Sequence, residues 1–150
     1  MQHRNRPDRS RPGRVRTRSR NHPRPRPQRA GRAARILIIE DEPEERLALQ
    51  LLLETDRREV RAAADGDEAM AILDQFRPDL VVMDWRMPGL SGAGLCRYIS
   101  ARVNPPPIVV VSSAKEAFES TEDIAVALHK PVDPGELQSV VGTWLPSQPR

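Results

Sequence analysis

The sequence predicts an α/β domain in which a parallel β-sheet is covered by helices on both faces. Three observations lead to this prediction. Short apolar runs alternate with segments whose apolar residues recur at helical spacing, and the alternation extends over residues 35–146. One of the apolar runs is continuous, as expected of a strand that is covered on both faces. A chain of 150 residues also has room for one domain of ordinary size.

Five strands are expected in this domain. The first three are the runs RILIIED (35–41), VRAAADG (60–66) and DLVVMD (79–84), of which the second is the weakest. The continuous apolar run is PIVVVSS (107–113), and a less regular fifth run is IAVALHK (124–130). Strands that alternate with helices are joined by crossover connections, so we expect them to pair in parallel.

The helices are predicted from the periodicity of the segments between the strands. The first is EPEERLALQLLLE (42–54), where Pro43 suits the first helical turn and the acidic residues beside it suit a helix N-terminus. Three further segments place apolar residues at positions i, i+3, i+4 and i+7, which marks one face of a helix. These stripes are Ala69, Ile72, Leu73 and Phe76; Gly92, Leu95, Cys96 and Ile99; and Leu137, Val140, Val141 and Trp144.

The charge divides the chain into two parts of opposite sign. Residues 1–35 hold thirteen arginines and one acid, a net charge of +12, whereas residues 36–150 hold eleven basic and twenty acidic residues, a net charge of −9. The basic part contains five prolines and no aromatic residue, so it cannot bury enough apolar surface to offset the entropy of ordering. We therefore expect a disordered Arg/Pro-rich tail over residues 1–34 and a short tail over residues 147–150.

Composition also bears on location. The basic segment lacks the apolar core of a secretory signal, and no apolar run reaches the length of a membrane span. The single cysteine, Cys96, excludes an internal disulfide and fits a reducing compartment. We therefore expect a cytoplasmic protein without a membrane span.

Polar residues stand where four of the five predicted strands end: Glu40 and Asp41, Asp84, Ser112, and Lys130. Because the carboxyl ends of parallel strands meet at one edge of a sheet, we expect these side chains to lie close together. Clustered carboxylates suit Mg²⁺, and a nearby lysine can pair with a carboxylate or a phosphate. An aspartate in such surroundings can act as a nucleophile towards phosphorus.

Four motifs in this order, ILIIEDE, LVVMDWRMPGLSG, PIVVVSS and HKP, resemble those of the receiver domain of two-component response regulators. The resemblance covers residues 35–146 and implies a flavodoxin-like fold. The five strands of the parallel sheet would then lie in the order 2-1-3-4-5, with helices on both faces.

The resemblance also assigns a role to each residue of the predicted acidic site. It implies that Asp84 accepts a phosphoryl group and that Mg²⁺ is held by Asp84, Asp41 and the backbone carbonyl of Arg86, with Glu40 acting mainly through metal-bound water. The donor would be a sensor histidine kinase or a phosphotransfer protein.

At the neighbouring strand ends, the resemblance implies that Ser112 is a switch hydroxyl and that Lys130 is the ion-pair partner of the phosphorylated site. It implies a cis peptide bond between Lys130 and Pro131. The phosphorylated domain would signal by binding a downstream protein whose identity is unknown. The resemblance also allows the domain to form a dimer. Only LPSQPR follows Trp144, so we expect a single-domain regulator. The sequence around Asp84 lacks the Asp-x-Asp spacing of aspartate-based phosphatases, and no Gly-rich phosphate loop is present, so we infer no external substrate that is turned over.

Two departures from the family concern the output surface. Ser112 and Lys130 are 18 positions apart, fewer than usual, so helix four within AKEAFESTED (114–123) is expected to be short or irregular. Ala127 stands where the family often has an aromatic switch residue. These departures leave open a receiver-like binding module that is uncoupled from phosphorylation.

The basic tail provides a further alternative. Its arginines could bind nucleic-acid phosphates, and without aromatic residues such binding would be nonspecific. The function would then reside in the tail. Another explanation of the tail is that translation starts nearer Arg35.

Overall fold

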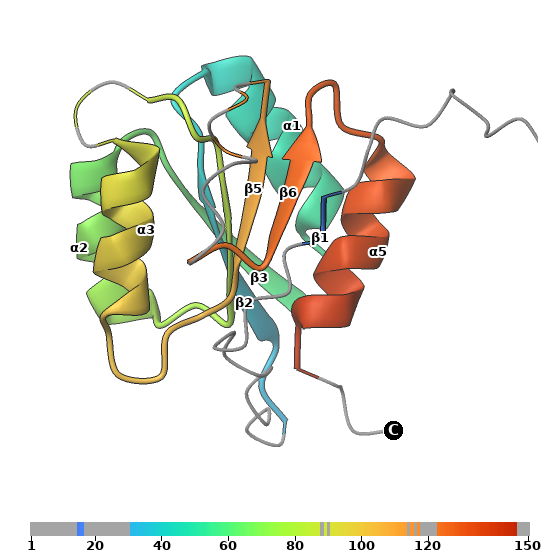
Figure 1. Ribbon diagram of the computed structural model, residues 1–150. Coiled ribbons are helices and arrows are strands. Elements are labelled where there is room, and N and C mark those ends of the chain that lie inside the picture. Colours follow the sequence, from blue (N-terminus) through green and yellow to red (C-terminus); the bar gives the residue numbers. More distant parts are fainter. Residues whose placement is uncertain are drawn as a thin grey trace, which may run out of the picture.

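The computed structural model describes residues 15–16, 31–87, 89, 91–113, 115, 117 and 123–146. Its core is a parallel sheet of five strands in the order β3-β2-β4-β5-β6 (Figure 1). The strands are β2 (Ala34–Ile39), β3 (Arg58–Ala63), β4 (Leu80–Met83), β5 (Ile108–Ser112) and β6 (Val126–His129). Numbered along the predicted domain, this is the order 2-1-3-4-5, so the predicted sheet is confirmed.

Helices cover both faces of the sheet, as predicted (Figure 1). One face packs against α1 (Pro43–Leu53) and α5 (Pro134–Trp144), and the other against α2 (Gly66–Phe76) and α3 (Gly92–Ser100). Successive strand residues point to opposite faces. In β2, Ile36 and Ile38 therefore join the core beneath α1 and α5, while Leu37 joins the core beneath α2 and α3.

Residues typical of helix N-termini stand at the start of each of these helices. Pro43 lies in the first turn of α1, and the side chains of Asp65, Ser91 and Asp133 accept hydrogen bonds from backbone N–H groups at the starts of α2, α3 and α5. The three predicted apolar stripes face the core, with Ile72 and Trp144 only partly buried. Most of the segment in which a short or irregular helix four is expected lies outside the described residues.

Within residues 1–34, where a disordered tail is expected, the structure describes one short strand. Within this tail, β1 (Val15–Arg16) pairs antiparallel with β6, with Val15 opposite Ala127 and Arg16 opposite Val126. The physical reason is that an edge strand presents unpaired backbone groups to which an extended segment can add. Residues 1–14 and 17–30 lie outside the described part of the chain.

Residues before Arg35 take part in the start of the parallel sheet. Ala34 is the first residue of β2, and the guanidinium group of Arg32 lies 3.0 Å from the carboxylate of Asp79. Asp79 is buried immediately before β4, and it also accepts a hydrogen bond of 2.8 Å from the backbone N–H of Arg35. This network joins the amino ends of β2 and β4, which are adjacent strands in the interior of the sheet.

No helix among the described residues is long and apolar enough to cross a membrane.

Candidate functional site

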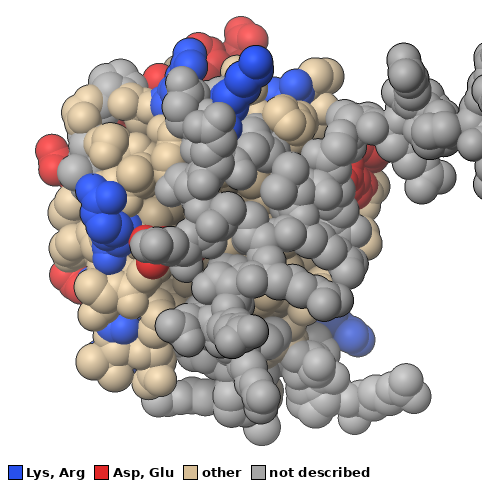
Figure 2. Space-filling view, in the orientation of Figure 1, with Lys and Arg blue, Asp and Glu red and all other residues tan. Residues whose placement is uncertain are grey.

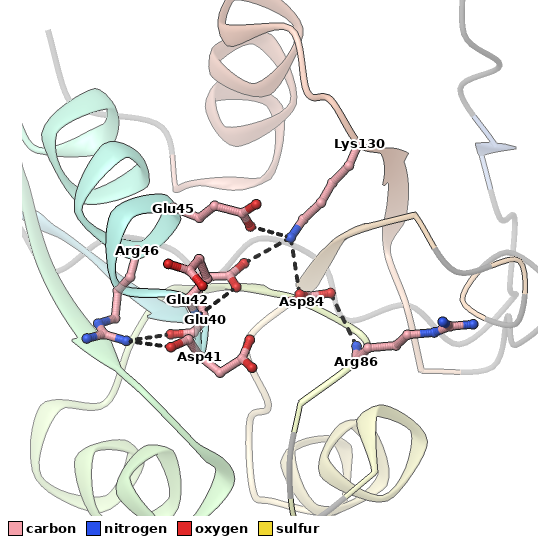
Figure 3. A network of polar contacts seen from close by, with 8 residues as sticks. All are labelled: Glu40, Asp41, Glu42, Glu45, Arg46, Asp84, Arg86 and Lys130. Carbon is pink, nitrogen blue, oxygen red and sulfur yellow. Dashed lines mark hydrogen bonds and ion pairs between the residues drawn. The ribbon is translucent and has the colours of Figure 1, made fainter.

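Three carboxylates meet at the carboxyl ends of β2 and β4 (Figure 3). Oxygen atoms of Glu40, Asp41 and Asp84 all lie within 4.8 Å of one another. Glu40 and Asp84 are buried, whereas Asp41 is exposed. Parallel pairing creates this arrangement, because Ile39 lies opposite Met83 and an acidic residue follows each of them at the same edge of the sheet. In the space-filling view, acidic and basic side chains both gather at this upper end of the domain (Figure 2).

Lys130 extends into the carboxylate cluster from the end of β6 (Figure 3). Its Nζ atom lies 3.1 Å from Asp84 Oδ2, 3.2 Å from Glu40 Oε2 and 2.5 Å from Glu45 Oε2. The peptide bond between Lys130 and Pro131 is cis, as the sequence resemblance implied. One ammonium group is therefore shared by three carboxylates.

The shared cluster shifts the protonation equilibria of two of its members. Burial raises the pKa of Glu40 to about 7, and the charge of Asp84 adds to this effect against the opposing influence of the Glu42 N–H group and Lys130. Burial alone would lower the pKa of Lys130, but its hydrogen bonds to Glu45 and Asp84 outweigh burial and raise the pKa above its usual value. Lys130 therefore stays positively charged, while full ionisation of Glu40 is costly near neutral pH.

Two residues after Asp84, the backbone turns so that its N–H group faces the Asp84 carboxylate. The backbone N–H of Arg86 donates a hydrogen bond of 3.2 Å to Asp84 Oδ1. Gly92, the first residue of α3, lies against Trp85 so closely that a Cβ atom there would be 2.5 Å from the Trp85 carbonyl oxygen. A glycine is therefore required for α3 to begin at this distance from the loop that follows Asp84.

Ser112 ends β5 beside the strand that carries Lys130. The side chain is buried, and the residue lies opposite His129 in the register of β5 and β6. The Lys130 N–H group also donates a hydrogen bond of 3.1 Å to the Ser112 carbonyl oxygen. Ser112 thus lies at the same edge of the sheet as the carboxylates. Ala127, two residues before His129, is fully buried in the core that contacts α2 and α3.

Sequence reasoning did not identify two residues that contact the site. Glu45 reaches Lys130, and Arg46 donates hydrogen bonds from Nη1 to the backbone carbonyls of Glu40, at 2.9 Å, and Asp41, at 3.3 Å. Both lie in the first half of α1, directly after the acidic pair. Their closeness to Glu40 and Asp41 in the sequence could have suggested a role in the site, but the sequence could not show which side chains of the helix face it.

A hollow lies at the opposite end of the sheet from the carboxylates, where the strands begin. It has a volume of about 780 Å³, and its lining includes Arg32, Arg35, Arg77 and Arg102. Three of these guanidinium groups contact acceptors of the fold, namely Asp79, Asp74 and the Phe76 carbonyl oxygen. These contacts account for Arg32, Arg35 and Arg102 as parts of the fold.

A Glu40→Gln variant should be more stable than the parent chain in the absence of divalent metal, and the gain should grow with pH. Raising a carboxyl pKa from 4.5 to about 7 means that stability is lost as pH rises between these values. The full effect corresponds to about 3 kcal/mol. Glutamine also loses the ion pair with Lys130, so we expect a net gain of about 1–2 kcal/mol at pH 8 and much less at pH 5.

Urea unfolding of both chains at the two pH values, in the presence of a chelator, measures this difference. The same substitution at exposed Glu44 provides the control and should give a small change that does not vary between the two pH values. A Glu40→Gln variant that is less stable at pH 8 than at pH 5, relative to the parent, would contradict the prediction.

Comparison with known proteins identifies the class to which this fold and site belong. Residues 36–142 match the family model of the response regulator receiver domain, so the chain belongs to this family. Receiver domains are the switch domains of two-component signalling systems.

Individual relatives agree with this assignment. The chain is 31% identical over 118 residues to protein PilH of Pseudomonas aeruginosa, a match that covers 75% of this chain and 98% of PilH. It is 34% identical over 131 residues to the positive alginate biosynthesis regulatory protein of the same organism, covering 75% of this chain and 52% of that protein. The chain spans about half the length of several of the curated relatives that it matches.

Among solved structures, the response regulator TrrA from Thermotoga maritima, in complex with Mg²⁺ and BeF, superimposes with a TM-score of 0.68. The two are 26% identical, and the match covers 75% of this chain and 99% of TrrA.

Proposed function

We propose that this chain is a phosphorylation-dependent signalling switch. It accepts a phosphoryl group on Asp84 from a sensor histidine kinase or a phosphotransfer protein, and it signals through contact with a downstream protein. The observation that carries the proposal is the meeting of the buried Asp84 carboxylate with two further carboxylates and the Lys130 ammonium group. In this function the chain receives and loses a phosphoryl group on itself and turns over no external substrate.

The transfer follows from the chemistry of the carboxylate. An oxygen atom of Asp84 attacks the phosphorus atom of a phosphohistidine, a P–O bond forms and the P–N bond breaks, and the imidazole nitrogen keeps the bonding electron pair. Lys130 lies within ion-pair distance of Asp84 and can contact the arriving phosphoryl oxygens. The N–H group of Arg86 holds the second carboxylate oxygen in place.

The donor set also fits a Mg²⁺ ion. Mg²⁺ prefers oxygen ligands, and three carboxylates within 4.8 Å of one another provide them. Asp41, Asp84 and the backbone carbonyl of Arg86 would hold the ion, and Glu40 would act through bound water. A Mg²⁺ ion held by these residues would supply positive charge for the phosphoryl oxygens during transfer.

The response to phosphorylation involves the ends of β5 and β6. Ser112 and Lys130, which lie at these strand ends, would contact a phosphoryl group on Asp84. Because position 127 is a buried alanine, no aromatic ring can relocate there, and the readout depends on movements of loops and backbone. This same alanine supports the second candidate function, a binding module with an intact acidic site that is uncoupled from phosphorylation.

Fluorescence of Trp85, which is adjacent to Asp84, tests the proposal in the full chain. Trp144 is replaced by phenylalanine so that Trp85 is the only reporter. Mg²⁺ should change the emission in a saturable way, and beryllofluoride, which mimics a phosphoryl group, should change it further when Mg²⁺ is present. In the presence of a chelator instead of Mg²⁺, beryllofluoride should have no effect.

The outcomes separate the alternatives. A response to Mg²⁺ without a further response to beryllofluoride would support the uncoupled binding module. If neither ligand changes the emission, the acidic residues do not form a working site, and the basic tail becomes the better candidate for the functional part of the chain.

A further inference from the structure

We propose that Glu45 competes with the phosphoryl group for the ammonium group of Lys130. Glu45 thereby limits how readily Asp84 is phosphorylated. The inference rests on the proposed function, because it concerns the charge balance of the same site.

The geometry shows that the ammonium group is already fully engaged. A lysine ammonium has three N–H donors, and Lys130 has three carboxylate acceptors around its Nζ atom. Glu45 is the nearest of them, at 2.5 Å, compared with 3.1 Å for Asp84 and 3.2 Å for Glu40. A phosphoryl group that approaches Lys130 must therefore share or replace one of these contacts.

Burial indicates which contact gives way. The side chain of Glu40 is 1% exposed, whereas that of Glu45 is 50% exposed. If the ion pair breaks, Glu45 can turn into solvent without losing packing, but Glu40 would remain buried as an unpaired group. Glu45 is therefore the displaceable partner of Lys130.

Charge determines the direction of the effect. A phosphoryl group on Asp84 adds negative charge to a site where one ammonium group already serves three carboxylates. The carboxylate of Glu45 repels this added charge and draws Lys130 away from it. Removing the Glu45 charge should strengthen binding of a phosphoryl analogue by about three- to tenfold.

The test compares Glu45→Gln with Glu44→Gln in the full chain that carries Trp85 as the only tryptophan. Both glutamates lie in the first turn of α1, so both variants lose the same charge at the same helix N-terminus. The dissociation constant of beryllofluoride is measured at saturating Mg²⁺, and that of Mg²⁺ is measured alone. For Glu45→Gln we expect tighter beryllofluoride binding but no tighter Mg²⁺ binding, since a lost negative charge does not favour a cation.

The control fixes the interpretation. Glu44→Gln should leave beryllofluoride binding within about twofold of the parent, because surface charges act weakly through water. Equal shifts in the two variants would overturn the proposal in favour of a general charge effect. Weaker or unchanged beryllofluoride binding by Glu45→Gln would also overturn it, and weaker binding would mean that Glu45 holds Lys130 in its productive place.

Failure of the proposed function gives a different result. In that case the parent chain itself does not respond to beryllofluoride in the presence of Mg²⁺, and the inference about Glu45 fails with it. A parent chain that responds, together with a Glu45→Gln variant that gains no affinity, overturns only the role of Glu45.

Discussion

Replacing Asp84 with asparagine is expected to abolish phosphorylation of this chain by acetyl phosphate. The amide lacks the nucleophilic carboxylate oxygen, while its size leaves the packing at the end of β4 unchanged. Intact-mass spectrometry should show the mass of one added phosphoryl group in the parent chain with Mg²⁺ and no such addition in the variant. We expect a loss of at least about a hundredfold in the phosphorylated fraction, because the acceptor atom itself is removed.

Asp74→Asn provides the matched control for this experiment. Asp74 is an exposed carboxylate on α2 that pairs with Arg102, away from the carboxyl edge of the sheet. Its replacement removes the same charge and should leave phosphorylation intact. If Asp84→Asn becomes phosphorylated to the same extent as the parent, Asp84 is not the acceptor.

Replacing Asp79 with alanine should cause a large loss of stability. This buried carboxylate pairs with Arg32 and accepts a hydrogen bond from the backbone N–H of Arg35. Alanine would remove the carboxylate that accepts from this guanidinium group and from this backbone N–H at the amino ends of two adjacent interior strands. We expect the free energy of unfolding to fall by about 2–4 kcal/mol, as measured by urea unfolding.

The comparison with Asp74→Ala tests whether burial causes this effect. The Asp74–Arg102 ion pair is as short, at 2.8 Å, but the Asp74 side chain is 66% exposed. An exposed pair contributes about 0–1 kcal/mol, so Asp74→Ala should be nearly neutral. Similar losses in the two variants would contradict our account of Asp79 as a buried anchor.

Much of the fold could be predicted because it depends on repeating local patterns. The apolar runs that became β4 and β5 are buried along their whole length, and β2 is buried except at Arg35, so their sequences are largely apolar and easy to identify. The stripe of α3 was also visible, because its four predicted positions are all buried. The strand order, by contrast, came from resemblance to a family, since periodicity does not say which strands are neighbours.

The pairing of β1 with β6 could not be predicted from residues 1–34. Composition indicates whether a segment can build a core of its own, and this segment cannot. Whether two of its residues add to an existing edge depends on the free backbone groups of β6, which are properties of the assembled sheet.

The sequence by itself determined which chemical groups would gather in this protein. Glu40, Asp41, Asp84 and Lys130 directly follow apolar strands, and parallel strands bring their carboxyl ends to one edge. Only the tertiary structure decided how these groups share charge. Lys130 lies 85 positions from Glu45 in the chain, and their contact exists because α1 and the end of β6 meet above the same edge. Ion pairing depends on distance in space and on burial, and neither can be read from the order of residues.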